Sequence, residues 1–176
     1  MKLPVVLLNF TGVYDYEPFA QRHGIVHVDC RDMNGVDCYC DEEGRSEIHR
    51  RLASYPVKAI HFIDSGDFHY LTEYWVSRLQ EPFTLIVFDH HPDMQQPRWA
   101  GVVSCGGWVS DVLRKNPFVK HIIVVGASDK LISQIPEDLR DRVIFYSQAT
   151  IDHHQAWPSK VGGIIHEPVY ISIDKD

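Results

Sequence analysis

The sequence predicts an α/β fold, a three-layer α/β/α sandwich in which helices cover both faces of a mainly parallel sheet. Short apolar runs alternate along the chain with polar segments and with segments of helical periodicity, an order typical of βαβ units. The runs are apolar throughout rather than at every second residue, as in strands that are buried on both faces. Strands are expected at residues 4–10, 25–29, 57–63, 84–88, 120–125, 142–146 and 168–173.

Three segments between these strands have the spacing of helices, at residues 42–54, 71–80 and 108–115. In the first, Ile48 and Leu52 share one face, and the following Pro56 favours termination. The third follows a Gly-Gly pair that can open a helix. Shorter helical turns are expected at 136–141 and within 150–161. No repeat, low-complexity segment or linker interrupts the pattern, so residues 1–176 are expected to form one domain.

Composition indicates a soluble globular protein without affinity for nucleic acid. The 176 residues are 44% hydrophobic and 23% charged, and their net charge is −7, which disfavours non-specific binding to nucleic acid. No apolar run approaches the roughly 18 residues of a membrane span. The apolar run at the N-terminus is too short for a secretory signal with its flanks. We therefore expect a cytoplasmic protein.

The four cysteines do not form a familiar zinc-binding pattern. Cys38 and Cys40 form a C-x-C rather than a C-x-x-C, and no second pair follows. The expectation for all four is a free thiol in a reducing compartment. A zinc-binding or disulfide role for the C-x-C is the alternative.

Three of the predicted strands end in side chains that can bind metal ions. These are Asp64, Asp67 and His69 after the strand at 57–63, Asp89, His91 and Asp93 after the strand at 84–88, and Asp174 and Asp176 after the last strand. In α/β proteins, ligands gather at the carboxyl ends of parallel strands. A spacing of two residues points the side chains of an extended segment to one side. The sets at 89/91/93 and 174/176 can therefore each aim at one point above the sheet.

The number and kind of these ligands indicate two metal ions rather than one. Four of these carboxylates, Asp89, Asp93, Asp174 and Asp176, together with the two imidazoles are already too many for one tetrahedral zinc ion. Mixed oxygen and imidazole donors suit two Mn²⁺, Fe²⁺ or Zn²⁺ ions, and carboxylates can bridge the two. Two such ions can share one water, lower its pKa and present it to an electrophilic carbon.

The same residues resemble the motifs of the arginase and agmatinase (ureohydrolase) superfamily. Asp89-His90-His91-Pro92-Asp93 resembles the D-A-H-x-D motif, and Ser172-Ile173-Asp174-Lys175-Asp176 resembles the start of S-x-D-x-D-x-x-D-P. Asp64-Ser65-Gly66-Asp67-Phe68-His69 stands where the family has G-G-D-H-S, and the three motifs occur in the family's order. The resemblance covers residues 62–176. It is nearest to a divergent arginase-like group, some members of which resemble enzymes that convert peptidyl arginine to ornithine.

The resemblance implies a binuclear manganese centre that hydrolyses a guanidino or amide-type C–N bond in arginine or a peptidyl-arginine-like substrate. The metal ligands that it implies are His69, Asp89, His91, Asp93, Asp174 and Asp176. Asp89 and Asp174 would bridge the two ions. Asp93 would also accept a hydrogen bond from the bridging hydroxide, and Asp67 would orient a ligand.

The sequence departs from the family pattern at three places. Cys105 stands where arginases have the His of an H-G segment, a proposed proton shuttle, so Cys105 is the candidate for that step and needs a tuned pKa to perform it. His90 replaces the Ala of the family motif. Family members continue beyond the position of Asp176 with further strands and a Glu that binds the guanidinium group. The chain is therefore expected to lack the C-terminal part of the fold.

Two other functions stay open. Residues 86–92 also resemble the Asp-His-His motif of a phosphoesterase superfamily, although residues 9–12 do not supply the early motif which that family needs. A metal-binding relative without catalytic activity is the second alternative, favoured by Cys105 and by the early chain end.

Other features favour no further site. A second Asp-His-His triplet at 152–154 is interpreted as a surface loop or helix start, and Asp129 as part of a polar loop. The expected partner is a small guanidino or peptide substrate, without nucleic acid or membrane, and self-association stays open.

Overall fold

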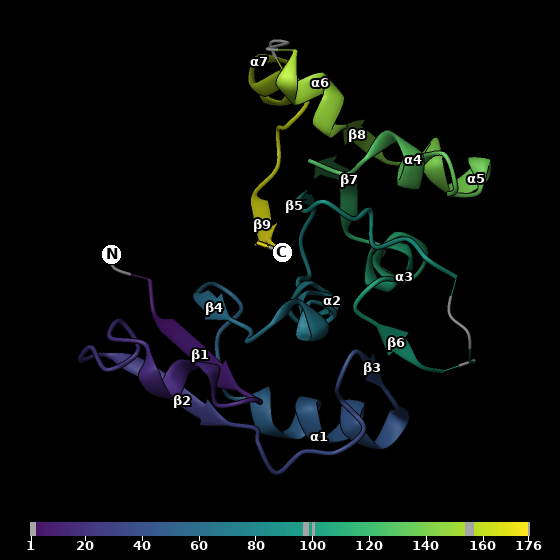
Figure 1. The fold of residues 1–176 in the computed structure, drawn as a ribbon. Coiled ribbons are helices and arrows are strands. Elements are labelled where there is room, and N and C mark those ends of the chain that lie inside the picture. Colours follow the sequence, from purple (N-terminus) through teal and green to yellow (C-terminus); the bar gives the residue numbers. More distant parts are fainter. Residues whose placement is uncertain (1–2, 97–98, 100, 154–156, 176) are drawn as a thin grey trace.

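The computed structural model describes residues 3–96, 99, 101–153 and 157–175, and it confirms the α/β fold (Figure 1). All seven predicted strands are present, and two very short strands join them, at Tyr39–Cys40 and Val103–Ser104. The strands are β1 (Val5–Asn9), β2 (Ile25–Asp29), β3 (Tyr39–Cys40), β4 (Ile60–Phe62), β5 (Phe83–Phe88), β6 (Val103–Ser104), β7 (Val119–Val125), β8 (Ile144–Tyr146) and β9 (Val169–Ile173).

The three predicted helices are present, and the polar segments add shorter ones. The helices are α1 (Glu42–Leu52), α2 (Leu71–Ser77), α3 (Trp108–Lys115), α4 (Asp129–Ile132), α5 (Glu137–Arg140), α6 (Gln148–Asp152) and α7 (Trp157–Gly162), with 3-10 turns η1 (Val13–Tyr16) and η2 (Gly66–Phe68). Hydrogen bonds from backbone N–H groups to N-cap side chains mark where several of these helices begin. The Asp41 carboxylate accepts a hydrogen bond from Gly44 N at the start of α1, and the Ser128 hydroxyl caps α4 in the same way. Of the helices in the described residues, none has the length and apolarity needed to cross a bilayer.

Parallel pairing dominates the strands. One sheet has the order β2-β1-β4 and another has the order β8-β7-β5-β9, and every neighbouring pair in these two sheets is parallel. The two-residue strands β3 and β6 pair antiparallel. β9 thus lies beside β5, a strand from the middle of the sequence, and the carboxyl ends of these two parallel strands lie next to each other.

The alternating side chains of β5 face two separate apolar cores, so the four-stranded sheet is covered on both faces. Leu85 and Val87 belong to a large core with side chains of α1, α2 and α3. Ile86 belongs to a smaller core that includes Val161 of α7. The continuous apolar run of β5 therefore corresponds to a strand that is covered on both faces.

The parallel strands form two sheets rather than the single sheet that the sequence led us to expect. β4 is an edge strand of one sheet and β9 is an edge strand of the other, and no described strand joins the two. On β9, Val169, Ile171 and Ile173 are exposed, with 55% of Ile171 accessible. Figure 1 shows the end of β9 between the two sheets, near the loop that follows β5. This position brings the last predicted ligands to the centre of the molecule.

Candidate metal centre

His69 is the centre of a buried cluster of carboxylates. Its side chain is only 2% accessible, and Nδ1 lies 3.0 Å from Asp93 Oδ2, 3.2 Å from Asp174 Oδ2 and 3.3 Å from Asp89 Oδ2. The ligand atoms of His69, Asp89 and Asp174 all lie within 4.8 Å of one another, as a single cation would require. Four of the six predicted metal ligands therefore meet at one point.

The parallel register of the strands produces this convergence. Phe88 of β5 pairs with Ile173 of β9, and Asp174 N donates a hydrogen bond of 2.9 Å to Phe88 O. The residues that follow these two strands, Asp89 and Asp174, consequently leave the sheet side by side. His69 arrives from the other sheet, at the end of the 3-10 turn η2.

The backbone around Asp89 is closely packed. Asp89 N donates to Val125 O of the neighbouring strand β7, at 3.0 Å. The next residue, Gly126, has a φ of +111°, and a Cβ there would lie 2.9 Å from Asp89 O. Only glycine fits this position without displacing the peptide of Asp89.

The two ring nitrogens of His69 have different surroundings. Nε2 lies 2.9 Å from Ser172 Oγ, which in turn lies 2.8 Å from Thr72 Oγ1. Nδ1 has no hydrogen-bond partner of suitable geometry among the described residues, although three carboxylate oxygens surround it. A His that binds a metal through one nitrogen usually has the other fixed by a hydrogen bond. The orphaned, buried Nδ1 and its ring of oxygens therefore fit a divalent cation.

Charge balance also favours a cation. Burial lowers the pKa of His69, but the carboxylates of Asp174, Asp89 and Asp93 outweigh it and raise the pKa to about 11. Burial raises the pKa of Asp93 to about 6, against the opposing effect of the nearby His69. A metal ion would replace the proton of His69 and supply the positive charge that the buried carboxylates of Asp89 and Asp93 and the partly buried carboxylate of Asp174 need.

Trp108 supports Asp93 from the first turn of α3. Its indole Nε1 donates a 2.6 Å hydrogen bond to Asp93 Oδ2, and its ring packs edge-on against His69 at 4.9 Å between centroids. The side chain of Trp108 is completely buried. Asp93 itself has a φ of +49°, a backbone conformation that is uncommon outside glycine. The loop after β5 is thus shaped to turn this carboxylate inward.

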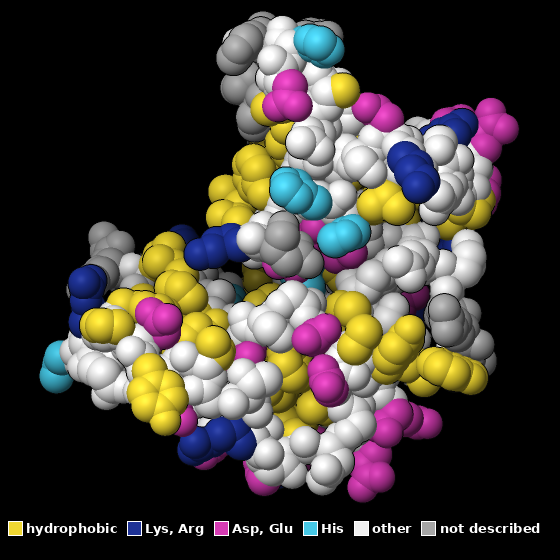
Figure 2. Space-filling view, in the orientation of Figure 1, with side chains coloured by type: hydrophobic (Ala, Val, Ile, Leu, Met, Phe, Trp, Pro, Cys, Tyr) yellow, Lys and Arg dark blue, Asp and Glu magenta, His cyan; other side chains and the backbone are white. Residues whose placement is uncertain are grey.

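The two oxygens of Asp89 face two different histidines. Oδ2 lies on the side of His69, whereas Oδ1 lies 3.4 Å from His91 Nδ1 and accepts a 2.6 Å hydrogen bond from His91 N. The side chain of His91 is 52% accessible. Figure 2 shows His and acidic side chains meeting near the centre of this face, over the ends of β5 and β9. This orientation suits a carboxylate that bridges a buried ion and a more exposed one.

The other residues singled out in the sequence lie elsewhere. Asp176, the sixth predicted metal ligand, lies outside the described residues. Asp64 is not turned towards the cluster, because Oδ2 accepts hydrogen bonds from Phe10 N and Thr11 N and joins β4 to the loop after β1. Asp129 and Asp152 are exposed on α4 and α6.

Cys105, the candidate for proton transfer, follows β6, and its Sγ lies 3.1 Å from Cys38 Sγ. Burial, the nearby Cys38 and Asp93 raise its pKa to about 12. Asp67 is exposed, and one of its oxygens lies within 4.8 Å of both sulfurs. Sequence reasoning did not bring these three residues together, and it did not find Trp108. The role of Ser172 was signalled only by its place two residues before Asp174.

Solved structures with a similar fold are arginase-like. The T. brucei arginase-like protein in an oxidized form matches 98% of this chain and 65% of its own, with a TM-score of 0.58 and 15% identity. A triple mutant of that protein, with Asp, His and Asp in place of Ser, Arg and Ser, is bound with Mn²⁺ and has a TM-score of 0.56 at 17% identity, covering 98% of this chain and 66% of its own. Formimidoylglutamase from Bacillus subtilis has a TM-score of 0.54 at 16% identity, over 74% of this chain and 43% of its own. The arginase-like fold implied by the motifs is therefore confirmed.

Sequence comparison adds one relative. An uncharacterized protein of Thermotoga maritima is 28% identical over 171 residues, which are 97% of this chain and 62% of that protein. The chain thus spans less than two thirds of the length of this curated relative. No family model matches the sequence.

Proposed function

We propose that this arginase-like chain is part of a metal-dependent hydrolase that breaks a guanidino or amide-type C–N bond, with arginine or a peptidyl-arginine-like compound as its substrate. The observation that carries the proposal is the buried Nδ1 of His69, which faces three carboxylate oxygens and has no hydrogen-bond partner of suitable geometry among the described residues. Such a donor set suits Mn²⁺, with Fe²⁺ or Zn²⁺ as alternatives.

Two ions are proposed. His69 and Asp93 would hold the buried one, His91 and Asp176 the exposed one, and Asp89 and Asp174 would bridge them. The opposite orientation of the two oxygens of Asp89 supports its bridging role. When bound, two such ions lower the pKa of a shared water and polarise the carbon that it attacks.

Asp93 is proposed to handle the proton of the attacking water. Its Oδ2 lies in the cluster, 3.0 Å from His69 Nδ1, where it could accept a hydrogen bond from a water held there. The indole N–H of Trp108 fixes the orientation of that carboxylate. Ser172, through Nε2 of His69, keeps Nδ1 turned towards the carboxylates.

Cys105 is the candidate to pass a proton to the leaving amine. With a pKa of about 12 its thiol is protonated at neutral pH, so it has a proton to give but is a weak acid. Removal of the thiol, as in Cys105→Ala, tests this step directly. A loss of turnover with unchanged metal content supports it, and unchanged turnover refutes it.

The similar structures guide the choice of substrates. Formimidoylglutamase is named for a formimidoyl compound, and the T. brucei protein is named arginase-like. Guanidino and formimidoyl groups share a planar carbon bonded to nitrogen, which is the atom that an activated water attacks. We therefore propose arginine, arginine-containing peptides and formimidoyl amino acids as the compounds to assay.

Metal analysis is the first test. The protein is loaded with Mn²⁺, freed of excess ion, and its metal content is measured for the wild type, Asp89→Asn and Asp152→Asn. Asp152 is a matched control, because it begins the second Asp-His-His triplet and is exposed. We expect about two equivalents of Mn²⁺ in the wild type and in Asp152→Asn, and none in Asp89→Asn. A wild type that binds no metal refutes the proposal.

Activity assays then separate the three functions. Urea or ammonia release from the guanidino and formimidoyl compounds supports the proposed hydrolase. Phosphate release from dinucleotides or pyrophosphate would instead support a phosphoesterase. Bound Mn²⁺ without either activity would indicate a metal-binding protein that has no catalytic role.

A further inference from the structure

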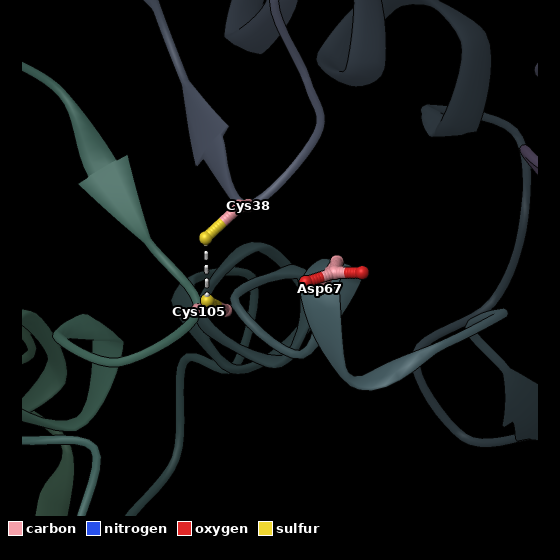
Figure 3. A group of neighbouring side chains, drawn as sticks. All are labelled: Cys38, Asp67 and Cys105. Carbon is pink, nitrogen blue, oxygen red and sulfur yellow. Dashed lines mark hydrogen bonds between the residues drawn. The ribbon is translucent and has the colours of Figure 1, made fainter.

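A second group of potential ligands, Cys38, Asp67 and Cys105, lies outside the carboxylate cluster. Figure 3 shows the two thiols directed at each other, with the Asp67 carboxylate beside the pair. The two Sγ atoms are 3.1 Å apart, and one oxygen of Asp67 lies within 4.8 Å of both. We call these three side chains the thiol cluster.

Backbone structure, rather than chance contact, holds the two thiols together. β3 and β6 pair antiparallel with Tyr39 opposite Ser104, so Cys38 and Cys105 are the next opposing pair. Cys105 N donates a 2.9 Å hydrogen bond to Cys38 O. Cys38 has a φ of +57°, which is uncommon for a residue other than glycine. This conformation is maintained although the two strands are only two residues long.

The third member comes from a different part of the fold. Asp67 lies in η2, just before His69, and brings an exposed carboxylate to half-buried sulfurs. A carboxylate has no part in a disulfide bond, but its oxygen is one of the ligand types that zinc accepts beside thiolate sulfur. Soft thiolates favour Zn²⁺, whereas the carboxylate cluster around His69 has the hard donors that Mn²⁺ prefers.

We propose that the thiol cluster binds one Zn²⁺ ion through the sulfurs of Cys38 and Cys105 and one carboxylate oxygen of Asp67, with the fourth position open to solvent. Thiolates on a tetrahedral zinc ion lie about 3.8 Å apart, given Zn–S bonds of about 2.3 Å. The sulfurs, now 3.1 Å apart, therefore move apart by about 0.7 Å on binding, which small side-chain rotations can supply. Two protons leave the thiols as the ion binds.

This site gives Cys105 a different role from the proton transfer considered above. A zinc ligand cannot carry a proton to a leaving group, so the two assignments exclude each other while Zn²⁺ is bound. The zinc site does not depend on the manganese centre, since the two share no proposed ligand. A variant of the carboxylate cluster such as Asp89→Asn can therefore be used as a control for the thiol cluster.

The test uses Co²⁺ and Zn²⁺ on the whole, fully reduced chain. Co²⁺ on thiolates gives an intense near-ultraviolet charge-transfer band that carboxylate and imidazole sites lack. We expect the band in the wild type and its loss on addition of Zn²⁺. Cys38→Ala and Cys105→Ala should each abolish it, and Asp67→Asn should weaken Zn²⁺ binding about tenfold or more.

Two controls keep the outcome interpretable. Cys30→Ala removes a thiol from the apolar core, and Asp89→Asn removes a carboxylate from the cluster around His69. Both variants should keep the Co²⁺–thiolate band. Thermal unfolding in the absence of metal should be nearly the same for wild type, Cys38→Ala and Cys105→Ala, because both thiols are half-exposed.

Three results would overturn the proposal. The first is a reduced wild type without the band, and the second is a band that survives both cysteine variants. The third is a Cys38–Cys105 disulfide in the purified protein together with no Zn²⁺ affinity after reduction, which would make the pair a redox couple. Failure of Mn²⁺ binding or of hydrolysis would leave the zinc site standing, since its readout is the thiolate band.

Discussion

The hydrogen bond from Trp108 to Asp93 can be isolated by comparing two tryptophans. Both Trp108 and Trp75 are completely buried. The indole N–H of Trp108 donates to Asp93 Oδ2 at 2.6 Å, whereas the N–H of Trp75 has no partner in the part of the chain that the structure describes. Replacement by Phe removes a similar volume at each site, so the packing losses largely cancel. The comparison therefore reports the hydrogen bond.

The expected difference follows from the charge of the acceptor. A hydrogen bond to a charged group contributes about 1.5–3 kcal/mol. Trp75→Phe also removes a buried, unpaired donor, which relieves a desolvation cost. Trp108→Phe should thus be less stable than Trp75→Phe by about 2 kcal/mol or more. For a chain of this size, that corresponds to a melting temperature lower by about 4–8 °C.

The assay is urea unfolding in EDTA, followed by circular dichroism at about pH 8, where Asp93 with its pKa of about 6 is ionised. At about pH 5 Asp93 is protonated, the bond becomes neutral, and the difference should shrink to about 1 kcal/mol. Variants of equal stability at the higher pH, within about 0.5 kcal/mol, would refute the reasoning. So would a difference that does not depend on pH.

Three further predictions concern the same cluster. Ser172→Ala should weaken Mn²⁺ binding about 10–100-fold in calorimetry, because it frees His69 Nε2, whereas Ser110→Ala, which removes a buried hydroxyl without a partner among the described residues, should leave it unchanged. Gly126→Ala should destabilise the protein by about 1–3 kcal/mol and weaken Mn²⁺ binding. Gly24 also has a positive φ, but a Cβ there would meet no atom within 4 Å, so Gly24→Ala should affect stability alone. Equal Mn²⁺ affinity in the two variants would contradict this. In EDTA, protonated His69 stabilises the fold fully below its ordinary pKa of 6.5, and this contribution is lost as pH rises through about 11. The free energy of unfolding should therefore fall more steeply between about pH 8 and 11 in wild type than in His69→Asn. Parallel profiles would refute the raised pKa of His69.

The central strands could be predicted because their apolar runs have a direct physical cause, burial on both faces of the sheet. β5 is the example, with Leu85 and Ile86 in two different cores. The division into two sheets could not be predicted, because a run of apolar residues does not state which strand is its neighbour. β3 and β6 were missed since a two-residue strand such as Tyr39–Cys40 has no periodicity to detect.

The members of the carboxylate cluster could be predicted from chemistry and position together. Asp89 and Asp174 follow apolar runs directly, and parallel strands place such residues at one edge. Trp108 could not be found in this way, because a tryptophan in a helix is ordinarily a core residue and its partner, Asp93, is fifteen residues away. The pairing of Cys38 with Cys105 depends on tertiary structure alone, across 67 residues of sequence.

The pairing of β9 with β5 has a consequence for the order in which the cluster forms during synthesis. Asp93 and Asp174 are 81 residues apart (174 − 93). At about 5–20 residues per second, the ribosome needs about 4–16 s to make the chain between them. Throughout that time His69 can meet only two of its three carboxylates. A metal ion that needs all three carboxylates would therefore be bound only after synthesis has passed Asp174 and β9 has paired with β5, and the folded site together with the ions then available would decide which ion is bound.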